Sequence, residues 1–231
     1  MSLFIVNTTP LDVFEHMAFD ETLATGAAQN ESRYFLRFYD WGNFPPSATF
    51  GYAQFFSDVK KEFDAKNFKG PFTRRPTGGG VVYHEDDLTF SLVFNSPAAR
   101  AARIYEMLHG AINARINGGL AGAAPKEAYA PRVGGAAGIC FSNPVENDIL
   151  DGAGRKILGG AIRRFGNTVL YQGSLQRAGA RTDGLLKAQV QTALENLWNS
   201  KFAPYEFDKN FAAAARAAAE VYKTKQWTGK F

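Results

Sequence analysis

The spacing of hydrophobic residues along the chain predicts groups of strands separated by helices. Val13, Met17 and Leu23 fall on one face of a helix over residues 11–26, which ends at Gly26. Runs of apolar, β-branched and aromatic residues predict strands at 34–41, 47–53, 81–84, 88–95, 145–150, 156–164 and 168–176. Amphipathic patterns predict further helices at 57–67, 98–117, 185–198 and 211–223.

The order of these elements predicts an α+β fold. Helices and strands do not alternate one by one, as they do in a doubly wound parallel sheet, so we expect a mixed or antiparallel central sheet flanked by helices. Ser57 is the expected N-cap of the second helix. Phe165, Gly166 and Asn167 are typical of a tight hairpin turn between the last two strands. No repeat or linker divides the chain, so residues 1–231 are interpreted as a single domain.

The composition is that of an ordinary globular protein. Of the 231 residues, 45% are hydrophobic and 21% are charged, which excludes an intrinsically disordered chain. No apolar run reaches the roughly 18 residues of a membrane span. The N-terminus lacks the features of a signal peptide, and one cysteine cannot form an internal disulfide, so we expect a cytoplasmic protein with no membrane partner. Three scattered histidines and one cysteine give no zinc-ligand cluster, and no metal site is expected.

The charge balance is mildly basic. Lysine and arginine number 26 against 22 aspartates and glutamates, which gives a net charge of +4. Such a balance favours an acidic partner, either a phosphate-bearing cofactor, a nucleic acid or an acidic protein domain, although a solvated surface is the usual reason for it. The arginines are dispersed and no helix-turn-helix pattern precedes the rest of the chain, so we expect no nucleic-acid partner.

The densest chemical signal is a glycine-rich stretch, RRPTGGG, which is predicted to be a loop. Gly78, Gly79 and Gly80 leave backbone N–H groups bare and free to adopt positive φ, so the loop can form an anion-binding concavity. Arg74 and Arg75 precede them and are suited to pair with a phosphate or carboxylate. The alternative is a flexible turn with surface arginines. The spacing matches neither the Walker A loop nor the GxGxxG fingerprint.

A second signal is the lysine in GRKILGG. In a strand, Lys156, Leu158 and Gly160 face the same side, so the lysine shares an apolar face. Gly159 and Gly160 are expected to leave room for a substrate beside the strand. The alternative is a strand-end lysine whose charged head reaches water.

Further positions carry candidate chemistry. Cys140 lies in a predicted loop upstream of Lys156. A cation near a thiol lowers its pKa from ~8.5 and so favours the nucleophilic thiolate. The alternative is that Cys140 is an inert apolar residue, as most lone cysteines are. His84 lies at the end of a predicted strand. It is a candidate general base, and the alternative is a hydrogen-bonded structural histidine. Asn147 and Asp148 are candidates to hold a metal or a ribose, or they merely end a strand.

Five stretches, in order, resemble the lipoate–protein ligase and octanoyltransferase family, which is related to the biotin ligases. They are HMAFDETLA, LRFYDW with PPSATFGYAQ, RRPTGGGVVYHEDDLTFSL, GRKILGGA with LYQGSLQ, and YKTKQWTGK. The match runs along nearly the whole chain. The resemblance implies one α+β catalytic domain of the biotin/lipoyl protein ligase type. It also implies an apolar tunnel for an acyl chain and a product that is an amide on a lysine of a lipoyl domain.

The resemblance also implies roles for the candidate residues. Lys156 is expected to contact the acyl carbonyl, where a fixed ammonium stabilises the negative charge that develops on oxygen. In one octanoyltransferase branch, octanoate passes from acyl carrier protein to a loop cysteine as a thioester. The stretch CFSNPVENDILDGAGRKILGG is similar to that branch, with Cys140 at the position of the nucleophile. The residues expected to contact the substrate are Arg74, Arg75, Gly78, Gly79, Gly80, Val82, His84, Gly159, Gly160 and Gly173.

Two alternatives remain within this resemblance. A ligase would use ATP and magnesium to form an acyl-adenylate, and Asn147 with Asp148 resembles the pair that ligases place near it, whereas a transferase requires no cofactor. A non-catalytic domain that binds a lipoyl group or a carrier protein is the other. Gln172 stands where the family often has histidine before Gly173, so the role of that strand is open. The expected acceptors are lipoyl domains of 2-oxoacid dehydrogenase complexes or the glycine cleavage H protein, whose acidity suits a basic chain.

Overall fold

The structure is a computed structural model, and it describes residues 1–26, 32–116, 148–151 and 154–231. Its strands are β1 (Ser2–Val6), β2 (Arg33–Phe38), β3 (Ser47–Phe50), β4 (Phe72–Arg74), β5 (Val82–His84), β6 (Leu88–Asn95), β7 (Ile149–Leu150), β8 (Lys156–Phe165), β9 (Thr168–Leu175) and β10 (Phe202–Tyr205). Its helices are α1 (Val13–Thr25), α2 (Phe56–Ala65), α3 (Ala101–Ile116), α4 (Gly184–Leu197), α5 (Lys209–Tyr222) and α6 (Lys225–Thr228), with a 3₁₀ turn at Ala180–Thr182. Over these residues, no helix combines the length and the apolar character that a membrane crossing requires.

Two sheets organise the fold. The larger has the order β10-β1-β2-β6-β9-β8-β7, in which β1 runs parallel to both β10 and β2 and the other neighbours are antiparallel. The smaller has the order β4-β3-β5, with β3 parallel to β4 and antiparallel to β5. The prediction of an α+β fold with a mixed sheet is therefore confirmed.

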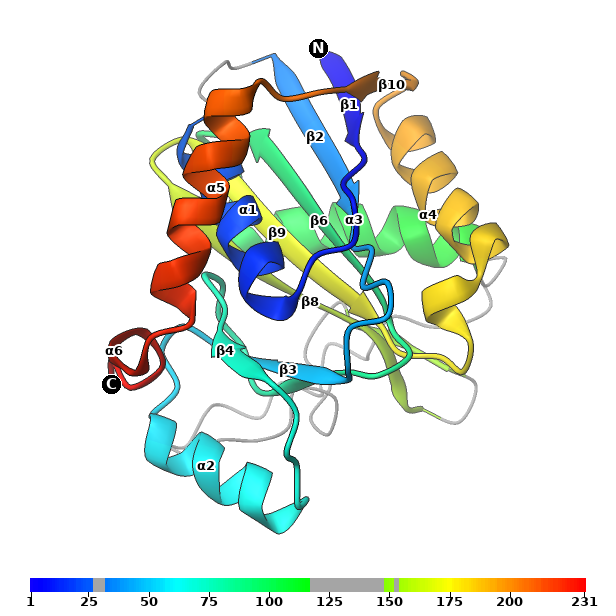
Figure 1. The fold of residues 1–231 in the computed structure, drawn as a ribbon. Coiled ribbons are helices and arrows are strands. Elements are labelled where there is room, and N and C mark those ends of the chain that lie inside the picture. The colour runs from blue at the N-terminus through cyan, green and yellow to red at the C-terminus, as the bar shows by residue number, and fades with distance from the viewer. Residues whose placement is uncertain (27–31, 117–147, 152–153) are drawn as a thin grey trace.

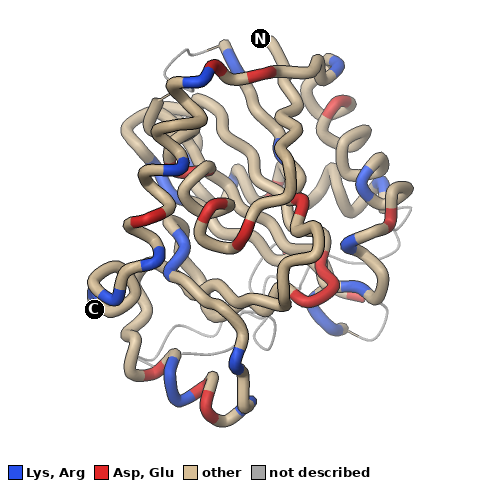
Figure 2. The backbone as a smooth tube through the Cα atoms, in the orientation of Figure 1, with Lys and Arg blue, Asp and Glu red and all other residues tan. Residues whose placement is uncertain are grey.

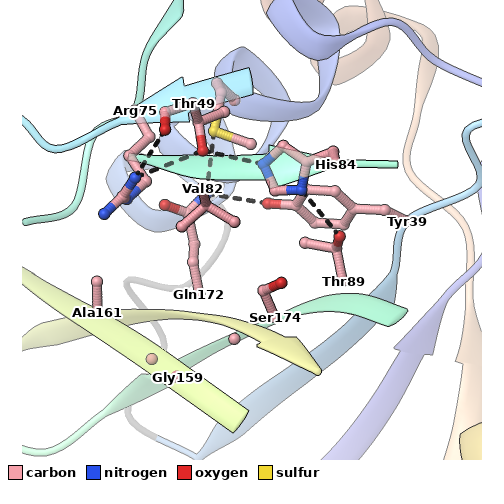
Figure 3. A pocket seen from close by; sticks show the side chains of 13 residues that line it. Tyr39, Thr49, Arg75, Val82, His84, Thr89, Gly159, Ala161, Gln172 and Ser174 are labelled. Carbon is pink, nitrogen blue, oxygen red and sulfur yellow. Dashed lines mark hydrogen bonds between the residues drawn. The ribbon is translucent and has the colours of Figure 1, made fainter. Parts of the chain in front are cut away.

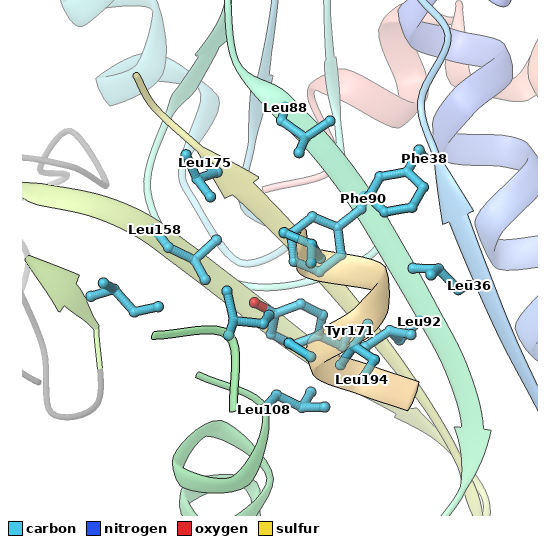
Figure 4. Packing of buried hydrophobic residues seen from close by; sticks show 14 of the residues in the cluster. Leu36, Phe38, Leu88, Phe90, Leu92, Leu108, Leu158, Tyr171, Leu175 and Leu194 are labelled. Carbon is cyan, nitrogen blue, oxygen red and sulfur yellow. The ribbon is translucent and has the colours of Figure 1, made fainter. Parts of the chain in front are cut away.

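Helices cover both faces of the larger sheet (Figure 1). Helices α3 and α4 enclose the main apolar core against one face, where Phe90 and Tyr171 lie among leucines from the same strands (Figure 4). Helices α1 and α5 lie over the other face, and α2 packs on the smaller sheet through Val59 and Phe63. As a result, every residue of the central strands β6 and β9 is buried, including the polar ones.

Local sequence signals explain where α1 begins and ends. Asp12 accepts a hydrogen bond from the backbone N–H of Glu15, and the Glu15 carboxylate accepts one from the N–H of Asp12, which forms a capping box. The helix ends before Gly26, as predicted. Its buried face carries Asp20 as well as Met17, so a charged residue enters the interior along an otherwise apolar stripe.

Several sequence-based predictions need correction. The N-cap of α2 is Phe55, not Ser57, and it makes no side-chain cap bond. Arg74 ends β4 instead of lying in a loop. The strands over 81–84 and 88–95 belong to different sheets, so the polar turn between them carries the chain from one sheet to the other.

Three strands were not predicted: β4 in the smaller sheet, and β1 and β10 at one side of the larger sheet. β1 is only five residues long, and β10 contains Pro204, which lacks a backbone N–H. β10 is an edge strand that pairs only with β1 in the described part of the fold, so a proline is tolerated there. Pairing with a distant parallel strand leaves no local sequence signal.

The two signs of charge are mixed on α2 and separated on some other elements. Figure 2 shows lysines and acidic residues together along α2, whereas α1 carries acidic residues and no lysine or arginine. On α2, Lys60 pairs with Asp64 at 2.8 Å and Lys61 with Asp58 at 3.0 Å. The excess positive charge is therefore not concentrated on this helix.

Candidate active site

The polar residues of β6 and β9 share one face of the larger sheet. Register places Ser91 opposite Gln172 and Thr89 opposite Ser174, and these four side chains are buried. Ala161 of β8 extends the first of these rows. Buried polar groups require hydrogen-bond partners, so these two rows indicate a part of the interior that contains hydrogen-bond networks as well as apolar packing.

A pocket of about 380 Å³, measured out to its mouth, lies between the two sheets (Figure 3). Of the residues predicted to contact substrate, those that line it are Arg75, Val82, His84, Gly159, Gly160 and Gly173. The lining also includes residues not singled out from the sequence, namely Met17, Tyr39, Thr49, Thr89, Ala161 and Ser174, together with Gln172.

On one side of the pocket, His84 joins the two sheets through hydrogen bonds. Its Nδ1 lies 2.9 Å from Oδ2 of Asp87, and its Nε2 lies 2.9 Å from Oγ1 of Thr49. Thr89 and Ser174 donate hydrogen bonds to the same Asp87 oxygen, at 2.7 and 2.5 Å. Burial by itself raises the pKa of the Asp87 carboxyl, but the neighbouring His84 ring and the three hydrogen bonds outweigh it, so that pKa is lowered and the carboxylate stays charged.

On the other side, Asp20 is the centre of a second buried network. It pairs with Arg37 at 2.6 Å, and both side chains are fully buried. It also accepts hydrogen bonds from Ser91 at 2.8 Å, from Gln172 Nε2 at 2.9 Å and from the hydroxyl of Tyr39. Burial, and then the Asp20 charge, raise the pKa of the Tyr39 hydroxyl, which therefore remains a donor.

His16 completes this network as a neutral ring. Its Nδ1 lies 2.7 Å from Nη1 of Arg37 and its Nε2 lies 3.2 Å from the carbonyl oxygen of Asp40. Burial, followed by the charge of Arg37, lowers the pKa of His16 well below its ordinary value. The neutral ring accepts from Arg37 through Nδ1 and donates to Asp40 through Nε2.

Gln172, the departure from the family's histidine, connects the glycine-rich loop to the sheet. Its Oε1 accepts a hydrogen bond from Oγ1 of Thr77 at 2.7 Å, while its Nε2 donates into the Asp20 network. The same loop is held by Arg163, whose Nη1 donates to the carbonyl oxygen of Pro76 at 3.1 Å. Both β8 and β9 therefore anchor this loop over the pocket.

The loop is compact, and its backbone passes close to β3. Arg75 donates hydrogen bonds to the carbonyl oxygens of Gly78 and Thr49. Gly79 has φ of 90°, and a Cβ at Gly51 would lie 2.0 Å from its carbonyl oxygen, so glycine is required at both positions. The three glycines themselves, Gly80 included, do not line this pocket, and their contact with substrate stays a prediction.

Arg74 lies elsewhere. Its guanidinium donates to the carbonyl oxygens of Gly51, Tyr52 and Gln54 and to those of Trp227 and Thr228. It does not line this pocket, although it was predicted to contact substrate. Its described contacts connect the C-terminal segment to the end of β3.

Gly160 and Gly173 line the pocket on the side of the larger sheet. The missing side chains of Gly160 and Gly173 leave space for the ring of Tyr171, since a Cβ at either position would come within 2.9 Å of that ring or its hydroxyl. The Tyr171 hydroxyl lies 2.8 Å from Nε2 of His109 on α3. Tyr171 therefore fills the space on that face of Gly160, while Gly160 also lines the pocket, and its contact with substrate stays a prediction.

Lys156, at the start of β8, is buried in an ion pair. Its Nζ lies 2.8 Å from Oδ2 of Asp148, and both side chains are only 3% exposed. The interpretation as a strand-end lysine that reaches water is therefore wrong. The register shifts between Ile149 and Leu150, which brings Leu150 opposite Lys156. The pocket lining begins at Gly159, three residues further along the strand, and neither member of the pair is itself part of that lining.

Two predicted residues, Cys140 and Asn147, lie outside the described residues. Among the residues that are described, no three histidine, aspartate or glutamate side chains are grouped to hold a metal ion. The missed residues carried one usable signal: polar Thr89, Ser91 and Ser174, like Gln172, alternate with apolar residues or glycine in strands that helices cover on both sides. The partners on α1 and β2 carried none, because their contacts span distant parts of the chain.

Comparison with known proteins agrees with this architecture. Residues 12–192 match the family model of the lipoyl protein ligase A/B catalytic domain. Curated relatives named octanoyltransferase LipM include those of Oceanobacillus iheyensis, 30% identical over 178 residues, and Moorella thermoacetica, 32% identical over 186 residues. Each match covers 74% of this chain and 62% or 63% of the relative, so the chain spans a little over three fifths of these proteins.

A solved structure supports the fold assignment. Protein Ta0514 of T. acidophilum, solved with bound lipoic acid, superposes with a TM-score of 0.77 at 19% identity and covers 100% of both chains. At that identity the likeness concerns the fold, which it shares throughout.

Proposed function

Because the chain belongs to the lipoyl protein ligase A/B catalytic domain family, we propose that it transfers an octanoyl group to a lysine side chain of a lipoyl domain. The donor in this proposal is octanoyl-acyl carrier protein, and Cys140 carries the group as a thioester. The observation that carries the proposal is the buried Lys156–Asp148 ion pair at the start of β8, the strand whose residues 159–161 line the pocket between the sheets. The relatives named octanoyltransferase support the choice of acyl group.

The pocket is suited to an acyl chain. The surface that faces it is mostly apolar, with Met17, Val82 and Ala161 among the lining residues. Its polar side chains are engaged with one another, as in the two carboxylate-centred networks, so the surface left to a ligand offers few free donors. Each buried CH₂ group contributes about 0.8 kcal/mol, and an eight-carbon chain therefore gains several kcal/mol from this pocket.

In the first step, the Cys140 thiolate attacks the carbonyl carbon of the donor thioester. A new C–S bond forms to the enzyme, the C–S bond to the carrier breaks, and the carrier leaves as a thiolate that takes up a proton. Negative charge develops on the carbonyl oxygen during the attack. The ammonium of Lys156 stabilises that oxygen in a water-poor setting, and Asp148 offsets the cost of burying the ammonium before substrate arrives.

In the second step, the amine of the acceptor lysine attacks the enzyme thioester. A C–N bond forms, the C–S bond to Cys140 breaks, and the amine loses a proton as the amide is produced. The thiolate is regenerated, so the cycle requires no ATP. The acceptor's lysine is supplied by a lipoyl domain of a 2-oxoacid dehydrogenase complex or by the H protein of glycine cleavage.

Intact mass spectrometry tests the proposal. After incubation with octanoyl-acyl carrier protein, the protein is expected to gain one octanoyl group that hydroxylamine removes and that is absent in Cys140→Ser. Lys156→Ala is expected to abolish transfer to a lipoyl domain. Lys61→Ala, whose side chain is 78% exposed, is the matched control and should transfer normally.

Two outcomes would contradict the proposal. Activity of Cys140→Ser with free octanoate that depends on ATP and magnesium would replace it with the ligase mechanism. An unimpaired Lys156→Ala would contradict the assignment of the site under both mechanisms.

A further inference from the structure

One wall of the pocket is built from four polar side chains, although the proposed ligand is an alkyl chain. Thr49 and His84 come from the smaller sheet and Thr89 and Ser174 from the larger one, and all four line the pocket (Figure 3). A wall of hydroxyl and imidazole groups ordinarily offers hydrogen-bond donors to whatever binds there. What these donors do therefore decides which ligands the wall accepts.

Behind this wall lies Asp87, which is 1% exposed and does not line the pocket. Its Oδ2 accepts three hydrogen bonds at once, from Nδ1 of His84 at 2.9 Å, from Thr89 at 2.7 Å and from Ser174 at 2.5 Å. Its other oxygen, Oδ1, has no hydrogen bond to any described residue and lies 3.9 Å from Nη2 of Arg181. One buried oxygen thus collects the donors of three lining residues.

The fourth donor is controlled through His84. With the ring hydrogen of His84 on Nδ1 and directed to Asp87, Nε2 serves as the acceptor for the hydroxyl of Thr49, at 2.9 Å. All four polar hydrogens are therefore engaged by protein acceptors. In this arrangement, these four side chains have no polar hydrogen left for a ligand.

We infer that Asp87 is a positioning residue that sets ligand specificity: by withdrawing the donors of the wall, it makes the pocket reject acyl chains that carry a hydrogen-bond acceptor. An oxygen on the chain would lose its water and find no donor here, whereas an unsubstituted alkyl chain loses nothing. The inference rests on the proposed function, since it takes the occupant to be an octanoyl chain.

A purely structural role for Asp87 would have a different consequence. Asp87 also connects the turn before β6 to β9, so its loss would loosen the pocket for every ligand. Changes in overall affinity therefore do not separate the two roles, but changes in the ratio of affinities for two ligands do. The probe ligands are octanoate and its 5-oxo and 7-oxo derivatives, whose ketone oxygen only accepts hydrogen bonds.

Titration calorimetry on the full chain measures this ratio. The wild-type protein is expected to prefer octanoate over both oxo derivatives by roughly tenfold or more. Asp87→Leu has a similar shape but no acceptor, so the released donors turn to the pocket. We expect it to shift the ratio by about tenfold toward at least one oxo derivative, and the derivative that gains marks the carbon beside the wall.

The triple variant Asp87→Leu/Thr89→Val/Ser174→Ala is the matched control. It lacks the carboxylate but also lacks the two hydroxyl donors, so its ratio is expected to return to within roughly twofold of the wild type. If Asp87→Leu does not fold in a thermal melt, Asp87→Asn replaces it. Its neutral amide oxygen accepts more weakly than a carboxylate, so a smaller shift in the same direction is expected.

The outcomes separate the inference from the proposed function. An unchanged ratio in Asp87→Leu, or a triple variant that behaves like Asp87→Leu, overturns the inference alone. A wild-type protein that binds octanoate no better than its oxo derivatives also overturns the inference. Absence of any octanoate binding by the wild type overturns the proposed function and the inference with it.

Discussion

Replacing Gly160 with alanine is expected to destabilise the fold, because the ring of Tyr171 occupies the place of the missing side chain. An ideal Cβ at this position lies 2.4 Å from Cε2 of Tyr171 and 2.6 Å from its hydroxyl oxygen. The ring cannot easily withdraw. It is fully buried under α3, and its hydroxyl is hydrogen-bonded to His109 at 2.8 Å. The added methyl group must displace an anchored side chain.

The size of the effect follows from three contributions. Forcing one extra methyl group into a packed interior costs about 1–3 kcal/mol. Displacing the Tyr171 hydroxyl from His109 costs roughly a further 1 kcal/mol. Removing a glycine from a strand returns about 0.5–1 kcal/mol, because the unfolded chain loses freedom. The net loss of unfolding free energy is therefore expected to be about 2 kcal/mol.

Urea unfolding measures this loss, and a double variant assigns it. Tyr171→Leu removes the ring, so Gly160→Ala added to it is expected to cost much less than it does alone. Gly110→Ala is the control, since a Cβ at that helical position meets nothing within 4 Å and should be neutral or stabilising. If Gly160→Ala unfolds like the wild type but no longer binds octanoate, the gap serves the substrate and the packing argument fails.

Three further changes test the buried polar groups. Asp20→Asn leaves the Arg37 guanidinium buried without its counter-charge and is expected to lower the unfolding free energy by about 3–5 kcal/mol in urea; a loss below roughly 1 kcal/mol would contradict this. Burial raises the pKa of Asp87, but the histidine and hydroxyl groups around it lower that pKa more, to below the unfolded value of about 3.9. The ionised Asp87 therefore stabilises the fold fully above roughly pH 5, and this stabilisation is lost as the pH falls through the folded pKa. Melting temperatures followed from pH 5 downward should therefore fall less in Asp87→Asn than in the wild type, and equal slopes would refute the linkage. Arg74→Lys cannot reach the same carbonyl oxygens, so hydrogen exchange at residues 225–231 should rise, and unchanged exchange would show that this segment is held by other contacts.

Much of the fold could be read from local pattern. The helix over 11–26, the strand over 88–95 and the hairpin around Gly166 depend on periodicity, capping and turn residues that act within a few positions of one another. The glycine-rich stretch and Lys156 were also singled out by residue type and spacing alone. The sheet order was not predictable in this way, since β1 and β10 are neighbours in space but lie about 200 positions apart along the chain.

The sequence by itself therefore determined the α+β class, most of the elements and the family, because these are written in short motifs and in the alternation of apolar residues. Only the tertiary structure decided which polar residues meet. Asp20 reaches Gln172 from a different element, and Asp87 collects donors from β5, β6 and β9. The physical reason is that burial makes a hydrogen-bond partner obligatory but leaves its identity to the packing of strands and helices that are remote in sequence.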